Sequence, residues 1–155
     1  MQLAPNFYLS EFVKSQTALR QGIDNTPDEH TIETLERLAK ELLQPVRNHF
    51  DAPIVITSGF RCPVLNLAIG SKDTSQHIRG EAVDFEVVGR GNYEVALYIR
   101  DNMDFDQLIL EFWRDDDPYA GWVHCSHVGK SWNRQQSLTI SKGKTAYGLP
   151  GDPHG

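Results

Sequence analysis

The stretch SQHIRGEAVD, residues 75–84, places His77 and Asp84 seven positions apart, and a second histidine, His124, follows in the short run Trp122-Val123-His124. Two imidazoles and one carboxylate are a common protein ligand set for a catalytic zinc ion, in which the fourth position is left to water. We therefore take His77, Asp84 and His124 as candidate metal ligands.

The residues around Asp84 alternate between apolar and polar with a period of two, which predicts a strand with one face on a core. The apolar positions are Val83, Phe85 and Val87. Asp84 then faces the opposite side, into a cleft. His124 alternates in the same sense with Val123 and Cys125. The two strands therefore present their candidate ligands on the side away from the core.

Several blocks in a fixed order resemble the M15 group of zinc peptidases. They are TSGFR at 57–61, Asn66, the Ser-x-His-x2-Gly-x-Ala-x-Asp pattern at 75–84 and WVH at 122–124, with FYLSEF at 7–12 and GIDNTP at 22–27. This group contains D-alanyl-D-alanine carboxypeptidases and related peptidoglycan endopeptidases, including phage endolysins. The closest resemblance is to the small phage and prophage branch, and it extends over most of the chain.

The resemblance implies roles for two further residues. In M15 relatives, the arginine at the position of Arg61 holds substrate and stabilises the developing oxyanion, for which a fixed guanidinium is suited. The bland alternative for an arginine is a surface salt bridge. Ser75 matches a serine that contacts substrate or orients the site. Its alternative is a loop hydroxyl bonded to its own backbone.

The general base departs from the family pattern. Many M15 enzymes carry an acidic residue three positions before the third metal ligand, where this chain has Gly121. Glu111 is the best substitute, because it alternates opposite to the apolar residues of its predicted strand. If this strand pairs with the strand of His124 so that the numbers of paired residues add to an odd sum, Glu111 and His124 lie on one face of the sheet. If the sum is even, they lie on opposite faces. The acidic loop 115–117 supplies the runners-up, Asp115, Asp116 and Asp117.

The remaining sequence predicts a single α+β domain over residues 1–155, with helices packed on a small, mainly antiparallel sheet. The resemblance implies the M15, hedgehog-like zinc peptidase fold. We expect an N-terminal clasp at 1–25 and a long helix from about 26 to 50. Thr26 would cap that helix, with Pro27 in its first turn, Glu29 completing a capping box and Pro45 as a possible kink. Further expected elements are strands at 54–58, 82–88, 107–112, 122–127 and 137–140, helices at 63–69 and 92–102 with Asn92 as a cap, and a flexible tail at 141–155.

Two cysteines do not make a disulfide framework. Cys62 follows Arg61 and Cys125 follows His124, so a shared site could bring the two sulfurs together. We favour two free thiols, with Cys125 buried on the apolar side of its strand. His127 is out of phase with His124 and is not expected to be a ligand.

Bulk properties exclude several classes of protein. The net charge of −6 leaves no basic footprint for nucleic acid, and no segment has the roughly 20 apolar residues of a membrane span. We also see no secretory signal, and therefore expect a monomer that stays in the host cytoplasm until release, or travels with a virion.

The function expected from these observations is zinc-dependent hydrolysis of a peptide bond in the peptidoglycan stem peptide. Two rivals stay open: a D-Ala-D-Ala carboxypeptidase, and a catalytically idle virion or binding module of the same fold. The loss of the usual acid at Gly121 favours the idle module, and the intact ligand set with Arg61 counts against it.

Overall fold

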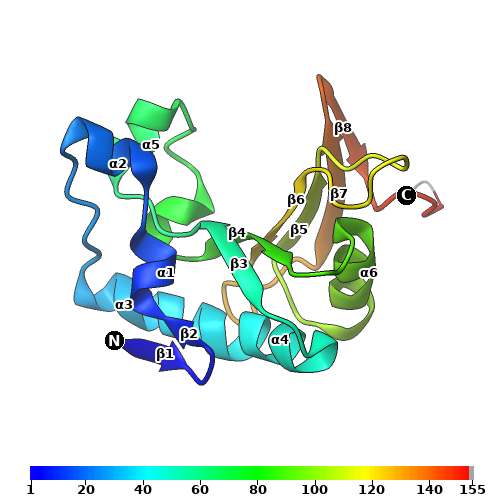
Figure 1. Ribbon diagram of the computed structural model, residues 1–155, viewed down its shortest axis with the longest axis horizontal. Helices are drawn as coiled ribbons and strands as arrows, with labels where there is room; N and C mark the ends of the chain where they lie inside the picture. The colour runs from blue at the N-terminus through cyan, green and yellow to red at the C-terminus, as the bar shows by residue number, and fades with distance from the viewer. Residues whose placement is uncertain (154–155) are drawn as a thin grey trace.

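A six-stranded mixed sheet forms the centre of the computed structural model, which describes residues 1–153 (Figure 1). In spatial order its strands are β3 (Ile54–Ser58), β4 (Ala82–Val87), β6 (Trp122–Ser126), β5 (Gln107–Glu111), β7 (Gln136–Ser141) and β8 (Lys144–Tyr147). All neighbouring strands are antiparallel except β5 and β7, which are parallel. The expected α+β class with a mainly antiparallel sheet is confirmed.

The N-terminal segment folds against one edge of this sheet. It consists of the two-stranded sheet β1 (Gln2–Ala4) and β2 (Phe7–Tyr8), followed by α1 (Leu9–Val13) and α2 (Gln16–Gln21). Helix α1 packs against β3, and the backbone N–H of Phe60 donates to the carbonyl of Phe12 at 2.7 Å. A Cβ atom at Gly59 would overlap that carbonyl oxygen, so only glycine lets the two segments approach so closely.

The long helix begins later than its sequence suggests. Asp28, not Thr26, is the N-cap of α3 (Glu29–Leu38), and its carboxylate accepts from the backbone N–H of Thr31 at 2.8 Å. Thr26 is instead bonded to the carboxylate of Asp24, which removes it from the capping position. The predicted capping box is therefore wrong, and an Asx-type turn precedes the helix.

Pro45 does not break the helical path. The α3 helix passes into a π-helical segment, η1 (Ala39–Leu43), and continues as α4 (Gln44–Phe50), with Pro45 in the first turn of α4. Proline lacks a backbone N–H, and the wider π turn just before it changes the hydrogen-bond partners where that donor is missing. The apolar side of all three segments faces the sheet.

Three shorter helices complete the fold: α5 (Pro63–Ile69), the 3₁₀ turn η2 (Gln76–Arg79) and α6 (Asn92–Asn102). Helix α5 ends at Gly70, as predicted, in a left-handed conformation. Helix α6 is capped by Gly91, not by Asn92. The buried amide of Asn92 instead donates to the carbonyls of Ala120 and Gly121 at 3.0 and 3.1 Å, which holds the turn before β6.

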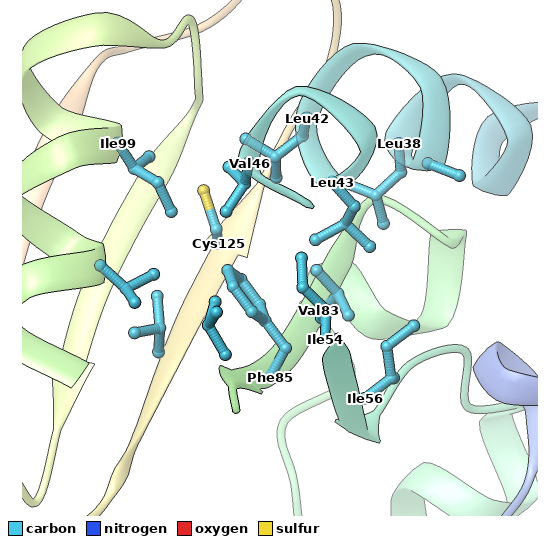
Figure 2. Close-up of a cluster of buried hydrophobic side chains, with 14 of the residues drawn as sticks. Leu38, Leu42, Leu43, Val46, Ile54, Ile56, Val83, Phe85, Ile99 and Cys125 are labelled. Carbon is cyan, nitrogen blue, oxygen red and sulfur yellow. The ribbon is translucent and has the colours of Figure 1, made fainter. Parts of the chain in front are cut away.

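One face of the sheet is buried under α3, η1, α4 and α6, and this interface is the core (Figure 2). Its labelled members are Leu38, Leu42, Leu43, Val46, Ile54, Ile56, Val83, Phe85, Ile99 and Cys125. The opposite face carries the polar residues of β4, β5 and β6. None of the helices in residues 1–153 is long and apolar enough to cross a membrane.

The C-terminal region is more structured than expected. Residues predicted to form a flexible tail instead contribute β8, and Leu149 is buried. Asp152 pairs with Arg100 of α6, and the Tyr93 hydroxyl donates to the carbonyl of Pro150. Residues 154 and 155 of the predicted tail lie outside the described residues.

Both thiols are free, and they differ in exposure. Cys125 is fully buried, and burial raises the pKa of its thiol, whereas Cys62 is half-buried.

Because the thiolate is the reactive species, we expect a maleimide reagent to modify the native protein at Cys62 and the denatured protein at both cysteines. Intact-mass spectrometry of the native protein and of the Cys62→Ser control gives the answer. Rapid double labelling of the native protein, or a mass for a bridged pair, would contradict this assignment.

Candidate active site

Three side chains converge on the open face of the sheet. One potential ligand atom from each of His77, Asp84 and His124 lies within 4.8 Å of the other two. Asp84 Oδ1 is 2.8 Å from His124 Nδ1 and 3.4 Å from His77 Nε2. This is the set chosen from the sequence, and it could hold a metal ion. Their role as ligands stays a prediction.

Strand pairing brings two of these residues together. Asp84 of β4 lies directly opposite His124 of β6 in an antiparallel register. Their neighbours Val83, Phe85 and Cys125 point into the core. Burial raises the pKa of the Asp84 carboxyl, but the hydrogen bonds with His124 and His77 outweigh it and leave the pKa well below its ordinary value. Asp84 therefore remains a carboxylate, the form that coordinates cations.

His77 is oriented by a backbone carbonyl. Its Nδ1 lies 2.7 Å from the carbonyl oxygen of Gly59, which can only accept, so Nδ1 carries the proton. Nε2 then faces Asp84, 3.4 Å from its Oδ1, and is the ring nitrogen that a metal ion bound there would meet. Hydrogen bonds of this kind fix the tautomer and direction of metal-binding histidines. His77 itself is buried, in η2.

Ser75 has the structural role that was the alternative to substrate contact, because its hydroxyl bonds to nearby backbone. Its hydroxyl oxygen accepts from the backbone N–H of His77 at 3.3 Å and so caps η2. Ser75 also lines the cavity around the candidate metal ligands. The hydroxyl proton remains available to donate, so substrate contact stays a prediction.

Arg61 is held in the cleft by a buried asparagine. The amide of Asn25 donates to the carbonyls of Val13 and Phe60 at 2.9 and 3.0 Å and accepts from the N–H of Cys62 at 2.7 Å. Arg61 is thus flanked by two anchored residues. Its guanidinium makes no ion pair or hydrogen bond within residues 1–153, and its Nε is buried without a partner. The salt-bridge alternative is therefore not what the structure contains.

Glu111 shares the cleft with the three candidate metal ligands. Ile109 of β5 pairs with His124 and Glu111 pairs with Trp122, which is the odd-sum register. Glu111 and His124 consequently line the same cavity. Burial, and then the charge of Asp84, raises the pKa of Glu111, with Arg61 among the groups that act in the opposite direction. A carboxylate with a raised pKa is suited to proton transfer near neutral pH.

Gly121 explains why the family's usual acid is missing. Its φ is +70°, and a Cβ atom there would overlap the carbonyl oxygen of Glu111 and lie 2.6 Å from the carbonyl carbon of Phe112. Phe112 itself adopts a positive φ of 57°. The backbone beside Glu111 is therefore packed against position 121, and no acidic side chain fits there.

A further carboxylate, Asp106, ties the loop of His77 to the sheet, and no sequence pattern predicted its role. Asp106, just before β5, accepts from Gln76 at 2.8 Å and from Arg134 Nε and Nη2 at 3.0 and 2.8 Å. Burial raises the pKa of Asp106, but the bonds from Arg134 prevail and lower it to about 2. Gln76 precedes His77, so this network braces the residue that carries a candidate ligand.

The other candidates lie outside this cluster. His127 faces the opposite side, as expected, and its Nε2 is 3.3 Å from Glu41. Asp116 and Asp117 pair with Arg114 in the exposed loop. The cavity itself has a volume of about 710 Å³, and His77, Asp84, Glu111, His124 and Arg61 share its lining.

The contact at Gly121 makes a measurable prediction. Gly121→Ala should lower the free energy of unfolding by more than the roughly 1–3 kcal/mol that a positive φ costs alone, because the new Cβ also displaces backbone. Gly143→Ala is the matched control, since Gly143 has the same φ of +70° but open space around it. Urea denaturation of both variants measures the difference. Equal losses would show that position 121 is not tightly packed.

Comparison with known proteins agrees with the geometry. The family model for Peptidase M15 matches residues 5–126, which include all three candidate ligands, Arg61 and Glu111. A comparison with curated proteins gave no match. Since the matched region is most of the chain and spans the whole cluster, this protein belongs to the peptidase M15 family.

Proposed function

We propose that this chain is a zinc-dependent peptidase that hydrolyses a peptide bond in the stem peptides of peptidoglycan. The observation that carries the proposal is one cavity that contains a two-histidine, one-aspartate cluster, an unpaired arginine and a carboxylate of raised pKa. These are the parts that hydrolysis of an amide requires: a metal site, an oxyanion partner and a base.

The donor set fits zinc. Two imidazole nitrogens and one carboxylate oxygen are typical of catalytic zinc sites, which keep one position free of protein ligands. His77, Asp84 and His124 would hold the ion, and the Gly59 carbonyl keeps the Nε2 lone pair of His77 available. A bound zinc ion supplies Lewis acidity toward a carbonyl and activates water at neutral pH.

The chain's own residues supply the proton transfers and the charge stabilisation. Glu111 accepts a proton from the attacking water and delivers it to the leaving amine. The Arg61 guanidinium faces the same cavity without an internal partner, so it is available to hold the oxygen on which negative charge develops. Ser75 lines the same cavity as His77, which supports a role in contacting the substrate.

The resemblance to the small phage and prophage branch also suggests where such an enzyme would act. A wall-degrading peptidase of that kind would act after host lysis or from a virion, and would act as a monomer on an insoluble polymer. The direct test incubates purified sacculi with the protein, with and without a chelator, and identifies released fragments by mass. Chelator-sensitive release of peptide fragments supports the proposal. Intact sacculi in the presence of zinc favour the idle module instead.

Metal binding gives a separate prediction. The wild-type protein should retain about one zinc ion per chain after dialysis, and His77→Ala or His124→Ala should lose it, because two remaining ligands hold zinc weakly. Elemental analysis measures the content, with the exposed His30→Ala as a control that keeps the ion. Full zinc in the His77→Ala or His124→Ala variant would overturn the ligand assignment.

The base assignment predicts a loss of rate without a loss of metal. Glu111→Gln preserves shape and removes basicity, so turnover of sacculi should fall by roughly 10²–10⁴-fold while zinc stays bound. Asp116→Asn should change little, since Asp116 lies exposed in the loop and pairs with Arg114. Near wild-type rates for Glu111→Gln would instead make the loop aspartates the candidates for the base.

A further inference from the structure

The catalytic cavity does not end at the metal ligands. A second cavity of about 380 Å³ shares Arg61 and Asp84 with it and extends across the end of β3 toward the start of α2. A third cavity, of about 790 Å³, shares Lys14, Ser15, Gln16 and Thr57 with the second. The three cavities therefore lie one after another along the surface. Asp84 and Arg61 lie between the catalytic cavity and the second cavity.

The far part of this path has a different chemistry from the metal site. The lining of the second cavity is about equally polar and apolar, and hydroxyl and amide groups such as those of Gln16, Thr17 and Ser58 contribute to its polar part. The third is mainly apolar, and Leu9, Val13, Leu19 and Ile23 contribute to it. Strand β3 is the edge of the sheet, helix α1 lies beside it, and α2 lies farther out next to α5 (Figure 1). The path thus leads off the sheet into a groove between α1, α2 and β3, here called the α1–α2 groove.

The α1–α2 groove leaves apolar surface open to water. Leu19 is 76% exposed, and Val13 and Ile23 are only half-buried. Apolar surface that is gathered in a concave site and left open to water is typical of binding surfaces. The groove adjoins the catalytic cavity through the second cavity, so a peptide bound at the candidate metal site would reach it if it extended past Asp84 and Arg61.

We infer that the α1–α2 groove binds the part of the peptide substrate that lies beyond the scissile bond, so that the enzyme cuts inside an extended peptide. This inference rests on the proposed peptidase function and specifies its substrate. An enzyme that trims a terminal residue needs a cleft that closes next to the metal, around the terminal carboxylate. Here a further cavity adjoins the candidate metal site at Asp84 and Arg61, which leaves room for substrate residues beyond the scissile bond.

The test compares two leucines that are similarly exposed, one inside the α1–α2 groove and one outside it. Leu19→Ser removes apolar surface from the groove. Leu67→Ser is the matched control, because Leu67 is 78% exposed on α5, which contacts α2, but lines none of the three cavities. Neither change touches the core or the catalytic residues, so both variants should fold. The substrates are a soluble cross-linked stem-peptide dimer, which has residues on both sides of the cross-link, and an uncross-linked stem peptide.

The inference predicts that Leu19→Ser raises KM for the cross-linked dimer about tenfold, the loss expected when most of one leucine contact is removed, without a change in kcat. KM for the uncross-linked peptide, and all constants of Leu67→Ser, should stay near wild-type values. Fragment masses should show cleavage within the dimer. Equal effects of the two variants, or products that have lost only a terminal residue, would overturn the inference.

A lack of hydrolysis with every substrate would refute the proposed function, and a binding measurement then decides the inference on its own. Fluorescence anisotropy with a labelled cross-linked dimer reports binding without turnover. Weaker binding by Leu19→Ser than by Leu67→Ser would retain the α1–α2 groove as a peptide site. Equal binding by both variants, or no binding by the wild-type protein, would overturn it.

Discussion

The antiparallel pairing of β4 with β6 is the constraint on which the site and the core both depend. It places Asp84 directly opposite His124, and the strand period of two sends Val83, Phe85, Val123 and Cys125 to the other face. A slip of one residue in either strand would bury a charged ligand and expose an apolar side chain. Packing of the core under α3, η1 and α4 therefore fixes the relative position of the candidate ligands Asp84 and His124.

The remaining parts of the site come from segments that are tied to this pair of strands. The Gly59 carbonyl orients His77, and Asn25 holds the residues on both sides of Arg61. Asp106 joins Gln76 to Arg134. Each of these anchors is a hydrogen bond made by a buried or half-buried group, where an unpaired partner is costly. The N-terminal segment thus positions the turn that contains Arg61 and forms one wall of the α1–α2 groove.

Much of this arrangement could be predicted from local patterns. Alternation in hydrophobicity gave the strands of Asp84 and His124, and the ligand set followed from residue type and side. The face of Glu111 depended on register, which a turn and the pairing partner decide, so the sequence left two options until the pairing of Ile109 with His124 was known. The N-cap at Asp28 was missed because Thr26 and Asp28 both suit that position, and the bond between Asp24 and Thr26 decides between them.

Long-range contacts account for most of what could not be predicted. The parallel pairing of β7 with β5 and the Asp106 network join residues far apart in the chain, and no short-range period encodes them. Strand β8 differs, because it forms a local hairpin with β7 in which Ser141 pairs with Lys144. Gly121 is the clearest case. In the sequence, Gly121 is recognisable only as the position where the usual acidic residue is absent. The structure shows that the backbone of Glu111 and Phe112 packs against Gly121 and leaves no space for a side chain. The same packing fixes the backbone beside Glu111 near the metal cluster.

The central claim is that His77, Asp84 and His124 together hold one zinc ion. X-ray absorption at the zinc edge of the purified protein tests this most directly, because it reports the identity and distance of the donor atoms. The account predicts a shell of nitrogen and oxygen donors at about 2.0–2.2 Å, with the multiple scattering of two imidazole rings. A sulfur shell at about 2.3 Å, or a signal without imidazole scattering, would place the metal elsewhere and contradict the account.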